Sequence, residues 1–126
     1  IKFNVSFDAV SQEAFNMFRV NSMLNSFDRI LLNIQLLSQY HVLNGILVTP
    51  NSYTTIEEYY KLCKFAKEHG AKYVLMNPLS EFGRGSEENG LGYTRDKLIL
   101  LREKTQKLID SSFEMVYIRF PNAVKN

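Results

Sequence analysis

The feature that most constrains the fold of this chain is a regular alternation of short β-rich runs with longer helical patterns. Residues 45–48 form a nearly all-apolar run stopped by Thr49 and Pro50, which is typical of a strand covered on both faces. The β-rich runs are residues 2–7, 45–48, 71–76 and 114–120. Strands separated by whole helices need crossover connections, so we expect a parallel sheet with right-handed crossovers. The sequence therefore predicts an α/β fold, with residues 1–126 as a single domain.

Local signals mark where the helices begin and end. Ser26 has the character of an N-cap, and Asp28 in the first turn suits the helix dipole, before an apolar stripe that continues to about Tyr40. Thr54 and Glu57 have the spacing of a capping box. Gly70 is a helix stop and Thr94 is a helix cap. We also expect a short helix over residues 11–18 and a polar, glycine-bearing loop over residues 80–93.

The composition excludes several classes of function. The chain has 15 basic and 13 acidic side chains, and a net charge of +2 is too small to indicate a nucleic-acid or membrane-surface partner. No apolar run approaches the roughly 20 residues that a membrane helix requires. The lone cysteine, Cys63, excludes a disulfide framework within the chain and is usual in a reducing cytoplasm, where we expect the protein to be.

Individual residues give few signs of a reaction. Cys63 lies on the apolar stripe of its helix, which indicates a small core residue and not a nucleophile. His41 and His69 fall at helix C-termini, and neither has a second ligand at metal-binding spacing, so no metal site is expected in this chain. The absence of a G-x-S-x-G elbow argues against a hydrolase, and the absence of a strand-end lysine argues against a Schiff-base aldolase.

The carboxyl ends of the strands are the expected ligand site, because parallel α/β folds bind ligands there. Ser6 and Asp8 are two residues apart and share a strand face, which suits ligand hydroxyls, an amine or a ribose diol. Arg19 could reach back over the same strand ends, and its planar fork suits a carboxylate or phosphate. The predicted strand ends are also followed by three asparagines, Asn51, Asn77 and Asn122.

Each of these residues also has a purely structural interpretation. Asp8 could cap the turn after its strand, and Arg19 could be a solvated surface side chain. Residues 83–85, Gly-Arg-Gly, could cradle an anion, but no phosphate-loop pattern accompanies them. Taken by themselves, the residues predict a parallel α/β layer with a polar rim and no defined reaction.

The order of these features resembles the second half of a radical S-adenosylmethionine (radical SAM) enzyme core, in the branch that contains the SPASM-type peptide-maturing and sulfatase-maturing enzymes. The stretch VSFDA at residues 5–9 looks like the family's fourth strand, with its S-x-D-A continuation toward Arg19. The stretch FDRILLNI at residues 27–34 is similar to the family's FDRVLENI helix. LVTPN at residues 47–51 looks like the end of the fifth strand, and residues 70–85 look like the sixth strand and its exit loop.

The resemblance implies the C-terminal half of a core barrel, in which the strands form part of a (β/α)6 TIM-like partial barrel. It also implies an iron–sulfur oxidoreductase, in which a [4Fe-4S] cluster reduces SAM and so releases methionine and a 5′-deoxyadenosyl radical. In such an enzyme the radical abstracts hydrogen from a small-molecule or peptide substrate. The implied SAM-binding residues are Ser6 and Asp8 for the methionine or ribose groups, Arg19 for the methionine carboxylate, and the strand ends at Val48, Met76 and Asn77 for the adenine.

The family's cluster motif, three cysteines spaced C-x3-C-x2-C, is absent from this sequence, and one cysteine cannot ligate a cluster. The chain also opens in strand-like alternation without an initiator methionine. We therefore expect a fragment whose natural start lies upstream, which is inert by itself and whose parent holds the cluster ligands. The alternative interpretation is a non-enzymatic α/β module that self-associates or binds a partner through open sheet edges.

Overall fold

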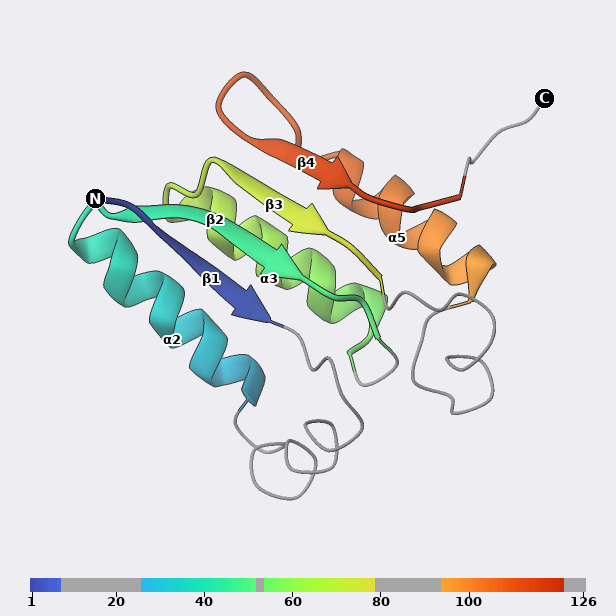
Figure 1. Ribbon diagram of the computed structural model, residues 1–126, viewed down its shortest axis with the longest axis horizontal. Coiled ribbons are helices and arrows are strands. Elements are labelled where there is room, and N and C mark those ends of the chain that lie inside the picture. The colour runs from blue at the N-terminus through green and yellow to red at the C-terminus, as the bar shows by residue number, and fades with distance from the viewer. Residues whose placement is uncertain (8–25, 52–53, 79–93, 122–126) are drawn as a thin grey trace.

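The described residues form a four-stranded parallel sheet whose strands are connected by helices (Figure 1). The computed structural model describes residues 1–7, 26–51, 54–78 and 94–121. In chain order the elements are β1 (Phe3–Phe7), α2 (Ser26–Gln39), β2 (Leu43–Val48), α3 (Ile56–Glu68), β3 (Tyr73–Met76), α5 (Arg95–Gln106) and β4 (Glu114–Tyr117). The strands lie in the sequential order β1-β2-β3-β4, and every neighbouring pair is parallel. The predicted α/β class and parallel sheet are confirmed, in an arrangement like part of an α/β barrel.

The helices pack on one face of this sheet and form the core there (Figure 1). The register sets one residue of each strand side by side in a row, and all of its members are buried: Val5, Ile46, Val74 and Met115. Since side chains alternate between the two faces, the residues two positions further along each strand also point toward the helices. The helices complete this core with the buried side chains of Ile34, Tyr59, Leu62, Cys63, Ala66, Leu98 and Leu101.

The opposite face of the sheet, here called the open face, carries no helix among the described residues. Its central row is Ser6, Leu47, Leu75 and Val116, and these side chains are exposed or half-buried. The expectation that residues 45–48 are covered on both faces therefore does not hold in the described part of the chain. The run is continuously apolar for a different reason: Ile46 and Val48 enter the core, while Leu47 contributes to an apolar centre on the open face.

The helix starts follow the sequence signals, with one correction. Thr94 caps α5 as predicted, because its side-chain oxygen accepts the N–H of Lys97. The capping box of α3 is formed by Thr55 with Glu58, so the prediction of Thr54 with the residue three positions later was wrong by one residue. Thr55 has the extended backbone that an N-cap needs, at φ −78° and ψ 163°, whereas Thr54 is buried in the preceding turn.

Three described residues in the left-handed region of the backbone stand just after the end of an element, and the first is His41, which follows α2 with φ +59°. Gly70 follows α3 with φ +93° and stops the helix as predicted. β4 ends at Tyr117, short of the predicted residue 120, because Arg119 has φ +61° and cannot continue an extended strand. β2 begins at Leu43, earlier than predicted, because Leu43 pairs with Phe3 and is buried.

Gly45 is needed in β2 because the ring of Tyr73 lies directly over it on the open face. A methyl group at Gly45 would overlap this ring, so a larger residue would displace Tyr73. Asn4 Oδ1 accepts three hydrogen bonds at the same place: from the N–H of Gly45 at 3.1 Å, from Asn44 Nδ2 at 3.1 Å and from the Tyr73 hydroxyl at 3.4 Å. The Tyr73 ring therefore fills the part of the open face near the amino ends of the strands.

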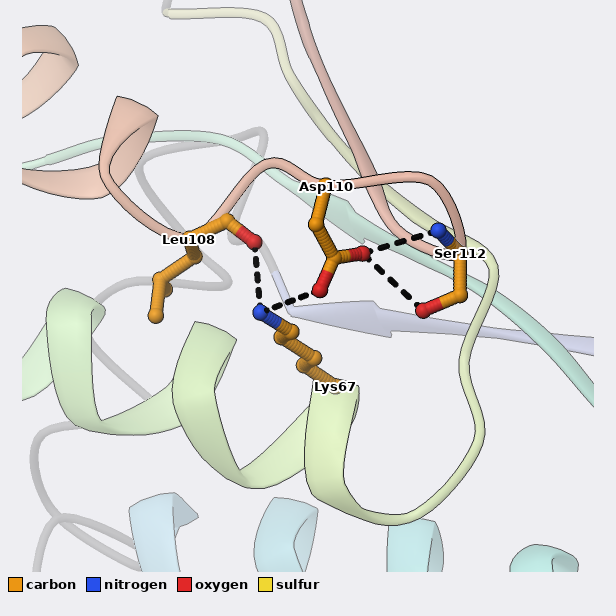
Figure 2. A network of polar contacts seen from close by, with 4 residues as sticks. All are labelled: Lys67, Leu108, Asp110 and Ser112. Carbon is orange, nitrogen blue, oxygen red and sulfur yellow. Dashed lines mark hydrogen bonds and ion pairs between the residues drawn. The ribbon is translucent and has the colours of Figure 1, made fainter.

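A lysine network connects the end of α3 to the turn that leads into β4 (Figure 2). Lys67 Nζ donates to the carbonyl oxygen of Leu108 at 2.9 Å and lies 2.9 Å from Asp110 Oδ2. Asp110 Oδ1 accepts hydrogen bonds from the N–H and the hydroxyl of Ser112 at 2.8 and 2.9 Å. These hydrogen bonds lower the pKa of Asp110 to about 2, and the bond from Lys67 has a larger effect than those from Ser112.

Two expected segments, the short helix over residues 11–18 and the polar loop over residues 80–93, lie outside the described residues. Among the helices that are described, none combines the length and the apolar character needed to cross a bilayer.

The Asp110 network predicts a pH-dependent contribution to stability. The carboxyl group titrates at about 2 in the folded chain, below its ordinary value near 4, so it stabilises the fold fully above about pH 4 and ceases to do so as the pH falls toward 2. We therefore expect Asp110→Asn to lower the free energy of unfolding at pH 6 and to approach the wild type at pH 2. Urea unfolding followed by circular dichroism at a series of pH values measures this difference.

Glu103→Gln is the control for this experiment, because Glu103 is exposed on α5 and forms no ion pair with the described residues. We expect it to keep the wild-type profile. A difference between Asp110→Asn and the wild type that stays constant from pH 6 to pH 2 would contradict the assignment.

Candidate functional site

The carboxyl ends of all four strands lie along one border of the sheet, here called the carboxyl edge (Figure 1). Backbone pairing continues past three of these strands, where Thr49, Asn77 and Ile118 donate their N–H groups to the carbonyl oxygens of Phe7, Val48 and Met76 at 3.2, 2.9 and 2.9 Å. The helices run back against the strands, so the amino ends of α2, α3 and α5 face the same border. Each helix start contributes partial positive charge there.

At the end of β2 a buried tyrosine fixes the path of the chain. The N–H of Asn51 donates to the Tyr59 hydroxyl at 3.0 Å, and Asn51 Nδ2 donates to the Thr49 carbonyl oxygen at 3.0 Å. Tyr59 is completely buried, and its ring lies against that of Phe7 with the centroids 6.1 Å apart. The side chain of Asn51 is itself buried, so this asparagine is a structural group of the turn.

At the ends of β3 and β4, Asn77 and Arg119 form a two-donor contact. Arg119 Nε and Nη2 donate to Asn77 Oδ1 at 3.2 and 2.9 Å. Arg119 Nη2 also lies 3.4 Å from the carbonyl oxygen of Pro78. Both guanidinium donors require an acceptor, so the oxygen of the Asn77 amide must face Arg119 and its NH2 group must point the other way.

The structure places four of the six residues that the sequence singled out. Val48 and Met76 are neighbours in the β2–β3 register, but their side chains are only 2% and 0% exposed and point into the helix-covered core. Ser6 is exposed on the open face of β1, in a row with Leu47. Asn77 follows β3 on that same face, since it is two positions beyond a residue of the central row.

The other two candidates, Asp8 and Arg19, lie outside the described residues. Of the candidates that are described, Ser6 and Asn77 therefore share the open face, whereas Val48 and Met76 reach the carboxyl edge only through their backbones.

The sequence singles out the strand exit that contains Arg119 without giving this residue a role, and it does not mark Tyr59 as a residue that shapes this edge. Arg119 stands at a predicted strand exit, but no local pattern indicates its left-handed backbone or its contact with a residue 42 positions away. Tyr59 is visible in the sequence only as a member of an apolar helical stripe. A hydroxyl on that stripe was the available signal, because a buried tyrosine usually finds a hydrogen-bond partner.

The described residues offer no ligand set for an iron–sulfur cluster. Cys63, the single cysteine of the sequence, is a buried residue of α3, and burial raises the pKa of its thiol, which opposes formation of the thiolate that a cluster requires. No three His, Cys, Asp or Glu side chains gather at metal-binding distance in the described ranges. The position of Cys63 in the core is as predicted.

Comparison of this chain with protein-family models, with curated proteins and with solved structures finds no match. The carboxyl edge presents a hydroxyl on β1, an amide after β3 and a guanidinium after β4, together with three helix starts. Hydrogen-bond donors dominate this set, which suits a polar ligand rich in acceptor oxygens.

The Tyr59 contact predicts a stability change at this edge. Tyr59→Phe removes the hydroxyl that accepts the buried Asn51 N–H, and an unsatisfied buried donor costs about 1–3 kcal/mol. We expect the free energy of unfolding in urea to fall by about this amount. Tyr60→Phe is the matched control, because the half-buried Tyr60 contributes its ring and not its hydroxyl to the contact with Lys104. Equal destabilisation by both substitutions would contradict the assigned role.

Proposed function

We propose that this chain forms one wall of a radical SAM enzyme barrel and contributes part of the SAM pocket. The observation that carries the proposal is the combination of sequential parallel strands with the described helices all on one face. Open doubly wound sheets place helices on both faces, whereas barrels keep them outside and turn the other face inward. The open face of this sheet would then line the interior of the barrel, and the carboxyl edge would hold the ligand.

The groups available at this edge fit the polar parts of SAM. The Ser6 hydroxyl and the Asn77 amide can bond to ribose hydroxyls and adenine nitrogens. By resemblance, Asp8 and Arg19 would contact the methionine and ribose groups, and the strand ends at Val48 and Met76 would bound the adenine through their backbones. In this family SAM supplies the 5′-deoxyadenosyl group that abstracts hydrogen from the substrate. The role proposed for this chain is to bind and orient SAM.

The cluster that cleaves SAM does not fit the residues of this chain, and no step of cleavage is assigned to them. A buried cysteine with a raised pKa is unsuited to ligate iron, so the three thiolates would come from another part of the parent protein. We therefore propose an oxidoreductase that is active only when this wall is combined with the cluster-binding half. A free cysteine thiol and a reduced cluster both suit the cytoplasm, where we place the protein.

Titration of this chain by itself with SAM tests the proposed SAM binding. We expect the backbone amide signals of Ser6 and Asn77 to shift in nuclear magnetic resonance (NMR) spectra and to saturate with SAM. Loss of one hydrogen bond of about 1 kcal/mol should weaken binding roughly fivefold in Ser6→Ala or Asn77→Ala. Asn33→Ala, a substitution of an exposed asparagine on α2, is the matched control and should bind like the wild type. The proposal would be refuted if SAM at millimolar concentration caused no shift in the NMR signals of residues at the carboxyl edge.

A second candidate function, self-association without catalysis, is favoured by the free flank of β1. β1 is an edge strand of the described sheet, and a groove of about 410 Å³ runs between it and α2. Phe3 and Leu36 line this groove and are 49% and 44% exposed. An unpaired strand edge beside exposed apolar side chains is a known template for association with another chain.

Two leucines of α2 allow a matched test of this candidate. Leu36 lines the groove, whereas Leu32 is 52% exposed on the same helix and does not line it. If chains associate through this flank, Leu36→Lys should abolish a concentration-dependent dimer seen by sedimentation velocity, and Leu32→Lys should preserve it. A monomer at every concentration, or equal loss in both variants, would argue against association through β1 and α2.

A further inference from the structure

Arg119 is a cation without a counter-charge in the described structure. Its side chain makes three hydrogen bonds, two to the amide oxygen of Asn77 and one to the carbonyl oxygen of Pro78. All of these acceptors are neutral, and no described carboxylate forms an ion pair with it. Arg119 is exposed, and its Nη1 group has no partner among the described residues. The guanidinium is thus held in one orientation while two of its N–H donors stay available.

The partner of Arg119 adds donors to the same place. Because Asn77 Oδ1 faces Arg119, the Nδ2 group of Asn77 points away from it and has no hydrogen-bond partner in the described residues. Asn77 Oδ1, the only side-chain acceptor of the pair, is therefore occupied by Arg119, and N–H groups of both side chains stay available. Such a pair matches a ligand with at least two acceptor oxygens and a negative charge.

The backbone and the position of Arg119 strengthen this match. Its φ of +61° is disfavoured for a residue with a Cβ atom, so the fold holds the side chain where a relaxed strand would not direct it. The contact also lies on the border that the starts of α2, α3 and α5 face, where the helix dipoles favour an anion.

We propose that Arg119 and Asn77 form a binding site for an oxyanion, either a carboxylate or a phosphate group of a small-molecule ligand. Arg119 binds the negatively charged group with the two N–H donors of Nη1. Asn77 both orients Arg119 and donates a further hydrogen bond. The oxyanion site is independent of SAM, because its charged group, Arg119, is not among the residues proposed to bind SAM; Asn77 is shared by the two proposed sites.

NMR of the arginine side chains tests the proposal with two defined probes. The full chain labelled with ¹⁵N is titrated with methyl phosphate and, separately, with acetate, each at an ionic strength held constant with sodium chloride. We expect the Arg119 Nε and Asn77 Nδ2 signals to shift together along a saturable curve. The probe with the lower midpoint identifies the anion as a phosphate or a carboxylate, and neither result depends on whether SAM binds.

Two lysine substitutions separate a shaped site from simple charge attraction. Arg119→Lys keeps the charge but loses the planar fork, and we expect it to weaken binding about tenfold. Arg102→Lys is the control, because Arg102 bonds to the Pro121 carbonyl oxygen and stacks on Tyr117 instead of contacting Asn77; it should bind like the wild type. Three results would overturn the proposal. They are signal shifts that never saturate, shifts of the Arg102 side chain as large as those of Arg119, and shifts of Asn77 Nδ2 that are unchanged in Arg119→Lys.

Discussion

Burial of one face of the parallel sheet is the constraint on which the rest of this structure depends. The row from Val5 to Met115 is excluded from water only because α2, α3 and α5 all pack on that side. Each crossover therefore returns the chain to the same border, so every strand ends, and every described helix begins, along the carboxyl edge. The same packing leaves the open face uncovered by the described helices. The candidate ligand site and the candidate association surface are both consequences of this one-sided core.

The sequence predicts those parts of the fold that depend on local pattern. The apolar stripe of α3, the cap at Thr94, the stop at Gly70 and the burial of Cys63 all follow from residue type and spacing. Residue type and spacing do not predict which side of the sheet each helix covers, because a run such as residues 45–48 is apolar whether its second face meets a helix or an open surface. The position of the α3 cap also depends on the turn before it, which buries Thr54 and leaves Thr55 extended.

The candidate site was predictable only in part, for a related reason. Ser6 and Asn77 could be assigned to one edge because parallel strands end together, and the structure places them on one face. The role of Arg119 depends on a contact over 42 positions and on a left-handed backbone, neither of which leaves a local signature. Conversely, Val48 and Met76 stand at the right strand ends, but alternation turns their side chains into the core.

The ring of Tyr73 above Gly45 makes the open face different at the two ends of the strands. Near the amino ends the surface is already occupied by an aromatic ring, anchored to Asn4 and seated where a side chain at Gly45 would otherwise stand. Near the carboxyl ends the strands continue into smaller polar residues, Thr49 and Asn77. Because the Tyr73 ring occupies the surface over Gly45, the part of this face left for a ligand is the part beside the strand ends, where the charged and polar groups lie.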